Sequence, residues 1–299
     1  MCMVQKTYLL GSFCVLVSAV LFGIQPIFGA QLQSFDVDPL ALNTIRYGVP
    51  AAFLLLISGR VGTTLNLSYV LRHGWLGLGF AGAGLGYYKA GYSIGFGLAV
   101  ILFFSFPLFV SLYSASILRI KTSAIQIVTM LTSLLGLVIA MDIGHLEINS
   151  LSGAGWAFFS AICYAGALLY RAHGAPHVGE YLSLTALMVT ASLVLLPIAW
   201  ITDAQFPVDT LSWSWAIGLA IVSGLIPIGL VMAGSRLIGA VDTATLCVIE
   251  PIVAVLVSIL ILNEVSSSST LYGGFLVIGS AVLLVRTQQK NNRVPQQVT

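Results

Sequence analysis

Ile238 to Glu264, IGAVDTATLCVIEPIVAVLVSILILNE, is a membrane-length apolar run with Glu250 and Pro251 near its middle. Counting from Val241 at about 1.5 Å per residue puts Glu250 roughly 14 Å deep, near the centre of a hydrocarbon core about 30 Å thick. An ionised carboxylate at that depth is disfavoured by several kcal/mol unless it finds a partner, a proton or water. Glu250 is therefore a candidate functional residue, and a neutral glutamate in a helix interface is the alternative.

Pro251 breaks the regular hydrogen bonding of this run. It has no backbone N–H, so the carbonyl of Cys247 lacks its usual donor. Inside a membrane such a break needs a neighbouring helix or a cavity to satisfy it. We expect a break here that serves the site, with an ordinary proline kink as the alternative.

The composition requires a membrane. The chain has 299 residues, of which 58% are hydrophobic and 7% charged, and its mean hydropathy is +1.02. A soluble domain carries about 25% charged residues. The lipid bilayer is thus the expected surroundings, and a net charge of +2 without a basic cluster gives no reason to expect nucleic acid as a partner.

No motif indicates a metal or a cofactor, so we expect neither. The cysteines lack the CxxC or CxxH spacing of metal sites and are interpreted as small apolar residues: Cys2, Cys14, Cys163 and Cys247. The first apolar segment is expected to be a retained span rather than a signal peptide. The reason is that Phe28 occupies a position where cleavage requires a small residue.

Hydropathy predicts an all-α integral membrane protein with ten transmembrane helices. They are expected at residues 8–30, 39–59, 73–92, 97–118, 123–141, 152–171, 181–201, 214–235, 241–262 and 270–286. The polar tail, 287–299, is predicted to be disordered and cytoplasmic.

Charges between these spans divide by side. If the spans alternate, every lysine and arginine outside them lies on the side of the N-terminus, and the opposite side holds acids such as Asp36, Asp203 and Glu264. Cytoplasmic loops carry the excess of lysine and arginine. The pattern predicts a multi-pass protein of the cytoplasmic (inner) membrane with both termini in the cytoplasm.

The chain repeats itself. YSIGFGLAVILFFSFPLFVSL from Tyr92 aligns with RLIGAVDTATLCVIEPIVAVL from Arg236, 144 residues later, and the segment at Ser18 aligns with that at Ser160 at an offset of 142. Five spans per half make the second half enter from the opposite side, as in the inverted repeats of secondary transporters. We expect five-helix repeats over 1–146 and 147–286, with chance similarity between apolar helices as the alternative.

Two such halves, each with a proline in its fourth helix, resemble the EamA-type branch of the drug/metabolite transporter superfamily. The Glu250-Pro251 and Asn263-Glu264 pairs are the most specific part of a similarity that covers nearly the whole chain. The resemblance implies ten transmembrane helices, alternating access and export of amino acids, related metabolites or toxic compounds. The chain departs from the pattern at Arg119-Ile120-Lys121, where many members carry an acid, and at Asn263, where glycine is common.

Three charged residues lie well inside the spans, namely Arg46, Lys89 and Glu250, and their repeat mates are uncharged. Arg46 or Lys89 could bind the carboxylate of a zwitterion and Glu250 its ammonium group, or a titrating Glu250 could couple transport to protons. Lys89 lies near the outer end of its span, so reaching the headgroups is its alternative role. For Arg46 the alternative is a structural ion pair.

Other candidate substrate-binding residues are polar or aromatic and share helix faces with one another or surround the charges. They are Ser18, Phe22, Gln25, Tyr88, Tyr92, Phe106, Ser160 and Tyr164. Contacts between helices and, for Tyr92, anchoring at the membrane interface are the alternatives. Candidate gating or kink positions are Pro107, Gly224, Pro227, Gly229 and Pro251.

The sequence therefore predicts a secondary transporter that exports a small amphipathic metabolite, and not an enzyme. A multidrug or toxic-cation exporter is the alternative within the same fold. An intramembrane enzyme lacks its motifs, because the four histidines lie in loops or at span ends. A receptor or assembly subunit is disfavoured by the short loops. The substrate, the coupling ion and the oligomeric state stay open.

Overall fold

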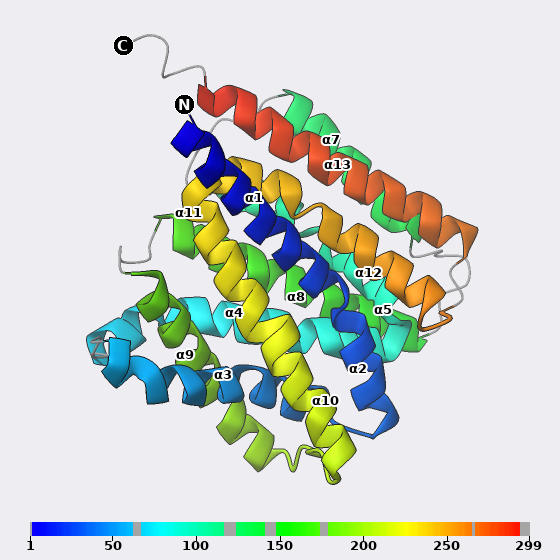
Figure 1. The fold of residues 1–299 in the computed structure, drawn as a ribbon. Coiled ribbons are helices and arrows are strands. Elements are labelled where there is room, and N and C mark those ends of the chain that lie inside the picture. The colour runs from blue at the N-terminus through cyan, green and yellow to red at the C-terminus, as the bar shows by residue number, and fades with distance from the viewer. Residues whose placement is uncertain are drawn as a thin grey trace.

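The computed structural model describes residues 2–61, 67–116, 124–140, 148–173, 179–264 and 267–293, and in these residues the regular structure is helical (Figure 1). In chain order the helices are α1 (Cys2–Gly23), α2 (Gln25–Ser34), α3 (Pro39–Val61), α4 (Leu67–Ile94), α5 (Phe96–Phe103), α6 (Phe106–Ser116), α7 (Ala124–Ala140), α8 (Ile148–His173), α9 (Glu180–Ile201), α10 (Thr210–Ala220), the π-helix η2 (Ile221–Leu225), α11 (Ile226–Leu246), α12 (Ile249–Leu260) and α13 (Ser268–Arg293).

Helices occupy all ten predicted segments, but several differ from a single straight span. The first span is divided into α1 and α2, the fourth into α5 and α6, and the eighth into α10, η2 and α11. The connection predicted at 236–240 is helical, because Leu237, Ile238 and Ala240 are compatible with a helix and only Gly239 opposes one. Helix α13 continues to Arg293, into the segment for which a disordered tail was predicted.

The protein is an integral membrane protein. Within the described ranges five stretches are long and apolar enough to cross a membrane, namely Thr7–Ser34, Pro39–Ser58, Leu151–Arg171, Glu180–Ile201 and Thr210–Ser235. Shorter apolar helices cover Phe96–Val110, Ile127–Ala140 and Ile249–Leu260. Large apolar side chains such as Leu56 and Trp200, each 82% exposed, cover the outer surface. Such a surface suits lipid rather than water.

The two repeats are inverted relative to each other, as predicted. Helices α3 and α9 are repeat mates and run antiparallel. At one end the Asp38 amide donates to the Gln205 carbonyl over 2.9 Å, and at the other the Tyr181 hydroxyl donates to the Leu54 carbonyl. The mates α7 and α13 also pack antiparallel, with the Thr270 hydroxyl donating to the Ala140 carbonyl over 3.2 Å. Antiparallel mates are what a two-fold axis in the membrane plane produces.

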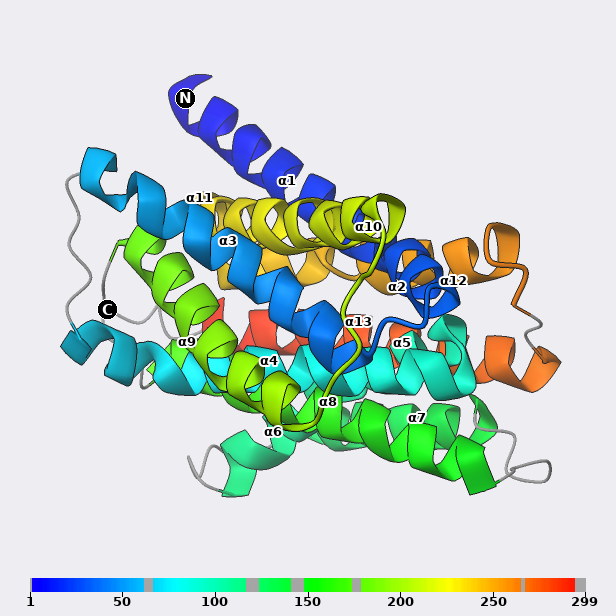
Figure 2. The same ribbon diagram turned by 90° about the horizontal axis from the view of Figure 1, so that it is seen from below.

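The helices that join the two halves obey the same symmetry. Helix α1 packs along α11, and its mate α8 packs along α4 (Figures 1 and 2). The Ser18 hydroxyl donates to the Pro227 carbonyl over 2.7 Å, and the Ser160 hydroxyl donates to the Ala83 carbonyl over 2.5 Å. Ser160 is the repeat mate of Ser18, and Pro227 is the mate of Ala83. The same hydrogen bond is thus made twice, once in each half.

Both fourth spans break within one residue of the same repeat position. The first breaks at Phe104 and Ser105, between α5 and α6, and the second at Cys247 and Val248, between α11 and α12. The Cys247 carbonyl, which Pro251 deprives of its usual donor, instead accepts the Glu250 amide over 3.0 Å in a tighter turn. The break predicted from Pro251 is therefore present.

Candidate functional site

Arg46 lies at the junction of three elements in the interior. Its side chain projects from α3 and is 6% exposed. The Nη2 atom donates to Gln25 Oε1 over 2.8 Å and to the Ser223 carbonyl over 3.0 Å. Gln25 begins α2 directly after the break at Ile24, and Ser223 lies within η2. Arg46 therefore connects the broken first span to the π-helix of the eighth.

The Ser223 carbonyl is available to Arg46 because of the local backbone. In a regular α-helix this carbonyl would accept the N–H of the residue four positions later, which is Pro227 and has none. The π-helical turn over Ile221–Leu225 also departs from the regular bonding pattern. Gly224 allows the approach, since an added Cβ would lie 3.3 Å from the Arg46 carbonyl. Three sequence features thus converge on one contact.

Within the described residues, no carboxylate lies within 4.0 Å of the Arg46 guanidinium group. Its Cζ atom lies 5.6 Å from the ring centroid of Tyr47 and 5.7 Å from that of Tyr88, so cation–π interactions supply part of its stabilisation. Arg46 Nε and the Tyr88 hydroxyl are buried without a hydrogen-bond partner. A buried cation bonded only to neutral oxygens, beside unsatisfied donors, favours an anionic group in its vicinity.

Glu250 lies in the first turn of α12 and is half-buried. It lies within the range of electrostatic interaction with Arg46. Glu250 does not form an ion pair with Arg46. Within the described part of the chain, the oppositely charged side chains whose atoms come within 4.0 Å of each other are Arg171 and Glu180. The interior therefore holds an acid and a base that are not in direct contact with each other.

Aromatic rings pack around Tyr164. Tyr164 on α8 packs its ring edge-to-face against Phe106, the repeat mate of Glu250, with centroids 4.9 Å apart. The same ring contacts Phe103 at 5.3 Å and Phe80 at 5.6 Å. Phe106 and Tyr164 are both half-buried. The predicted residues Phe106 on the fourth span and Tyr164 on the sixth thus meet in one aromatic cluster, while Phe22 on α1 packs against a separate apolar core.

Lys89 and Tyr92 lie apart from the Arg46 contacts. Lys89 Nζ lies 4.6 Å from the ring centroid of Trp156 on α8. The Tyr92 hydroxyl donates to the Val37 carbonyl over 3.1 Å, at the connection that leads into α3. The geometry therefore brings Arg46, Gln25 and Tyr88 together, whereas Lys89 points from α4 toward Trp156 of α8 and Tyr92 lies one turn further along α4.

The predicted gating positions divide into two kinds. Pro107, Pro227 and Pro251 lie at the helix irregularities described above, and Gly224 is a close-approach position. Gly229 is loosely packed, since the nearest atom to an added Cβ is Leu184 Cδ2 at 4.0 Å. Close packing thus gives a reason for a glycine at position 224 but not at position 229.

Glu264 has a role that hydropathy did not indicate. Its carboxylate accepts the Phe96 amide at Oε1 over 2.7 Å and the Gly97 amide at Oε2 over 2.8 Å, so it caps the N-terminus of α5 in the other repeat. Gly95 precedes this helix at φ 78°, and Asn263 adopts φ 53°, a conformation that asparagine tolerates better than most residues. The Asn263-Glu264 pair was the sequence signal for this contact.

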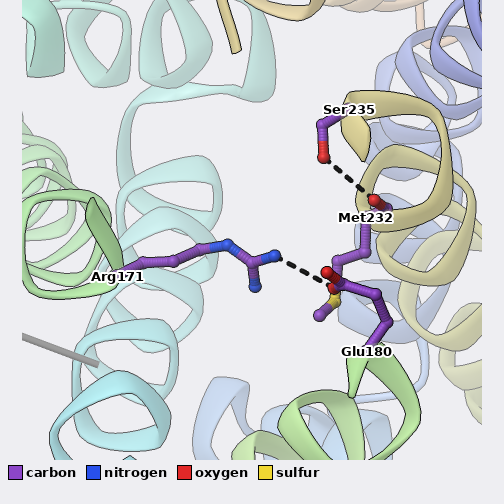
Figure 3. A network of polar contacts seen from close by, with 4 residues as sticks. All are labelled: Arg171, Glu180, Met232 and Ser235. Atoms are coloured by element: carbon purple, nitrogen blue, oxygen red, sulfur yellow. Dashed lines mark hydrogen bonds and ion pairs between the residues drawn. The ribbon is translucent and has the colours of Figure 1, made fainter. Parts of the chain in front are cut away.

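The ion pair between Arg171 and Glu180 lies outside this region. It joins the end of α8 to the start of α9 over 3.1 Å, near the hydrogen bond from Ser235 to the Met232 carbonyl (Figure 3). The two side chains are 34% and 29% exposed, so the pair contributes little to stability. This pair gives a reason for the acidic Glu180 on the side of the membrane where the predicted topology places the lysine and arginine residues.

A metal centre has no support in the described residues, where no group of three or more His, Cys, Asp or Glu side chains is placed to hold an ion. The departure from the family pattern at Arg119-Ile120-Lys121 lies outside those residues.

Two inverted helical repeats with helix breaks between them are an architecture found in secondary transporters. Residues 9–141 and 151–286 each match the model of the EamA-like transporter family. The chain belongs to this family, which is part of the drug/metabolite transporter superfamily and consists of non-enzymatic transporters.

The comparison with solved structures agrees on the fold. Among 27 matching chains, one described as "Crystal structure of protein" is 18% identical, has a TM-score of 0.60, and covers 93% of this chain and 98% of its own. At this identity the likeness concerns the fold alone. No curated protein matches the sequence.

Proposed function

We propose that the protein is a secondary transporter that exports small amphipathic metabolites, such as amino acids or related compounds, by alternating access. The proposal depends mainly on Arg46, a guanidinium group 6% exposed whose hydrogen bonds go to the Gln25 side chain and the Ser223 carbonyl, both neutral. A ligand carboxylate would supply the negative charge that the protein does not place in contact with it.

Glu250 supplies the opposite pole. It is half-buried and makes no direct pair with Arg46, so a ligand ammonium group can bind at Glu250 while the carboxylate binds at Arg46. The aromatic cluster of Phe103, Phe106 and Tyr164 would contact an apolar side chain between the two poles. Protons are the coupling ion we propose, with Glu250 as the group that binds them.

One observation favours a second candidate, an exporter of organic cations. Glu250 lies within electrostatic range of Tyr164, whose ring packs against those of Phe80, Phe103 and Phe106. A carboxylate beside aromatic rings suits a delocalised or quaternary cation. In that case Arg46 would not contact the substrate.

We also propose that the protein lies in the cytoplasmic (inner) membrane with both termini in the cytoplasm. The support is the segregation of lysine and arginine in the loops. A membrane-impermeant thiol reagent, applied to intact cells that carry a single cysteine at position 2 or 203, checks this orientation. Labelling at 203 and not at 2 is expected.

The function is tested by counterflow in proteoliposomes. Labelled L-phenylalanine, L-leucine and tetraphenylphosphonium are compared in two pH gradients, with the wild type, Glu250→Gln, Arg46→Gln and the control Glu180→Gln. We expect exchange of an amino acid that Arg46→Gln reduces at least tenfold, and a pH response that Glu250→Gln abolishes. The control should behave as the wild type, because Glu180 lies outside the site.

Normal transport and a normal pH response in Glu250→Gln would contradict the role of that acid. Exchange of tetraphenylphosphonium alone, insensitive to Arg46→Gln, would establish the second candidate instead.

A further inference from the structure

The fourth spans of the two repeats pack against each other at one side of the membrane. Helix α5, the first half of one of these spans, lies against α12, the second half of the other. An added Cβ at Gly97 on α5 would lie 3.3 Å from Ser258 Cβ on α12. In the proposed topology these halves lie toward the outside, because the loop that holds Glu264 lies opposite the lysines and arginines. We call this packing the α5–α12 contact.

The symmetry-equivalent packing is not formed at the other side. Repeat symmetry maps α5 onto the end of α11 and α12 onto α6, so a symmetric molecule would pack α6 against the end of α11. In the described residues α6 packs on α8 but lacks comparable packing on α11, and Figure 2 shows α11 above α4 and α6 below it. The fourth spans are therefore closed together toward the outside and apart toward the cytoplasm.

Glu264 connects the two sides of the α5–α12 contact. Its carboxylate oxygens accept the amides of Phe96 and Gly97 over 2.7 and 2.8 Å. The end of α12 fixes the acid in this position, because Asn263 has φ 53° and the Glu264 amide donates to the Ser258 carbonyl over 2.9 Å. Charge-assisted hydrogen bonds at a helix N-terminus are among the stronger polar contacts of a protein. One side chain of the second repeat thus holds the fourth span of the first.

The sequence provides no equivalent of this connection at the other side. The repeat mate of Glu264 is Ile120, whose side chain has no acceptor. The two amides that Glu264 accepts correspond to those of Ala240 and Val241, and α11 continues through both positions. Amides inside a helix donate to carbonyls of the same helix and are not free for a cap. The connection therefore belongs to the side on which the fourth spans are packed together.

We propose that Glu264 is the positioning residue that keeps the α5–α12 contact closed while the site faces the cytoplasm, and that this contact opens to release the substrate outside. The inference rests on the proposed function, because alternating access requires the outer side to open. Opening has to break the two hydrogen bonds of the carboxylate. Loss of the carboxylate should therefore shift the population toward the outward-facing state.

The sidedness of cysteine labelling tests the role of Glu264. Cys247 lies at the break between α11 and α12 and is half-buried, and it becomes the only cysteine when Cys2, Cys14 and Cys163 are replaced by serine. Its reaction with a membrane-impermeant methanethiosulfonate is timed from the outside in intact cells and from the inside in inverted vesicles. Glu264→Ala should raise the ratio of outside to inside rates at least fivefold. Glu264→Gln, which keeps one acceptor oxygen, should give an intermediate ratio.

Asp209→Ala is the matched control. Asp209 caps α10 on the same side of the membrane, but it accepts the amide of Ser212 in its own helix and connects no second span. Its loss should leave the ratio of rates unchanged. General destabilisation would speed the reaction from both sides, so a changed ratio reports a change of conformation. An unchanged ratio in Glu264→Ala, or an equal rise in Asp209→Ala, would overturn the inference.

A cross-link tests whether the α5–α12 contact has to open. Gly97→Cys and Ser258→Cys are combined in a chain whose four native cysteines are replaced by serine. Disulfides need Cβ atoms about 3.5–4.5 Å apart, so the 3.3 Å found here requires only a small adjustment. Oxidation should reduce counterflow of labelled L-phenylalanine at least tenfold, and reduction should restore it. The two single-cysteine variants, which cannot form this bond, should not respond to oxidation.

Mass spectrometry of the cross-linked peptides verifies the disulfide. Full counterflow by the cross-linked protein would refute the opening of the α5–α12 contact. If the wild type fails to exchange phenylalanine, the amino-acid function fails. The labelling ratio needs no substrate and still decides the role of Glu264.

Discussion

Arg46 and Glu250 are a base and an acid in the interior, yet they do not form an ion pair with each other. Arg46 is bonded instead to Gln25 and to the Ser223 carbonyl. Because the two side chains are not bonded to each other, the proposed ligand can bridge them without breaking an ion pair. A buried ion pair in direct contact would have to be broken before either partner could bind anything else.

The absence of a direct pair predicts weak energetic coupling. In a double-mutant cycle of Arg46→Gln and Glu250→Gln, the coupling in the free energy of unfolding should be below about 1 kcal/mol, compared with the 3–5 kcal/mol lost when a directly bonded buried pair is broken. Reversible unfolding in mixed micelles measures it. A coupling of about 3 kcal/mol would show that the two side chains are paired in solution.

Removal of the Glu264 cap should destabilise the protein. Glu264→Ala leaves the amides of Phe96 and Gly97 without their acceptor. We expect a loss of about 1–2 kcal/mol in the free energy of unfolding, in the range of a lost charged helix cap. Glu180→Ala is the matched control, since it removes a half-exposed ion pair and should cost under about 1 kcal/mol. Equal losses of unfolding free energy in the two variants would contradict the role of Glu264 as a helix cap.

Two glycines on the packed helices α4 and α8 predict opposite effects of the same substitution. Gly86→Ala would place a Cβ 2.7 Å from the Trp156 carbonyl, so we expect a loss of about 1–3 kcal/mol. Gly155→Ala on α8 meets no atom within 4 Å and should be neutral or stabilising by up to about 1 kcal/mol, because alanine favours a helix. Thermal unfolding in detergent compares the two. Similar melting temperatures for both variants would contradict the close approach.

The N-cap of α10 predicts a pH dependence. Asp209 accepts the Ser212 amide over 2.7 Å, and this hydrogen bond holds the pKa of the Asp209 carboxyl below its ordinary value. A lowered pKa stabilises the folded state above the unfolded pKa and loses that effect as the pH falls through the folded one. The melting temperature of the wild type should therefore fall more between pH 6 and pH 3 than that of Asp209→Asn, whose cap does not titrate. Parallel curves would contradict the prediction.

The sequence predicted the inverted repeats and the proline breaks because both follow from local patterns. The sequence itself contains the odd number of spans per half, the charges of the loops and the positions of Pro107 and Pro251. The proximity of Arg46, Gln25 and Tyr88 also agrees with polar faces that point inward. The antiparallel pairing of α3 with α9 then follows from the symmetry without further information.

Other features depend on partners far away in the chain. The bond from Arg46 to the Ser223 carbonyl joins residues 177 positions apart, and the cap from Glu264 to Phe96 joins residues 168 apart. Hydropathy measures the length of an apolar run and not its hydrogen bonding, so it did not predict η2, or α11 continuing through 236–240. The position of Lys89 over Trp156 depends on the packing of α4 on α8, which no single-helix pattern contains.

Pro227 exerts its effect one helical turn before its own position. By lacking an N–H it leaves Arg46 an acceptor that belongs to the main chain, and no exchange of the side chain at Ser223 can delete that oxygen. The contact consequently requires the proline at 227 and the arginine at 46. The side chain at 223 can vary, as far as the hydrogen bond of the Ser223 hydroxyl allows. A family member with another residue than proline at 227 would therefore need a different means of holding its arginine.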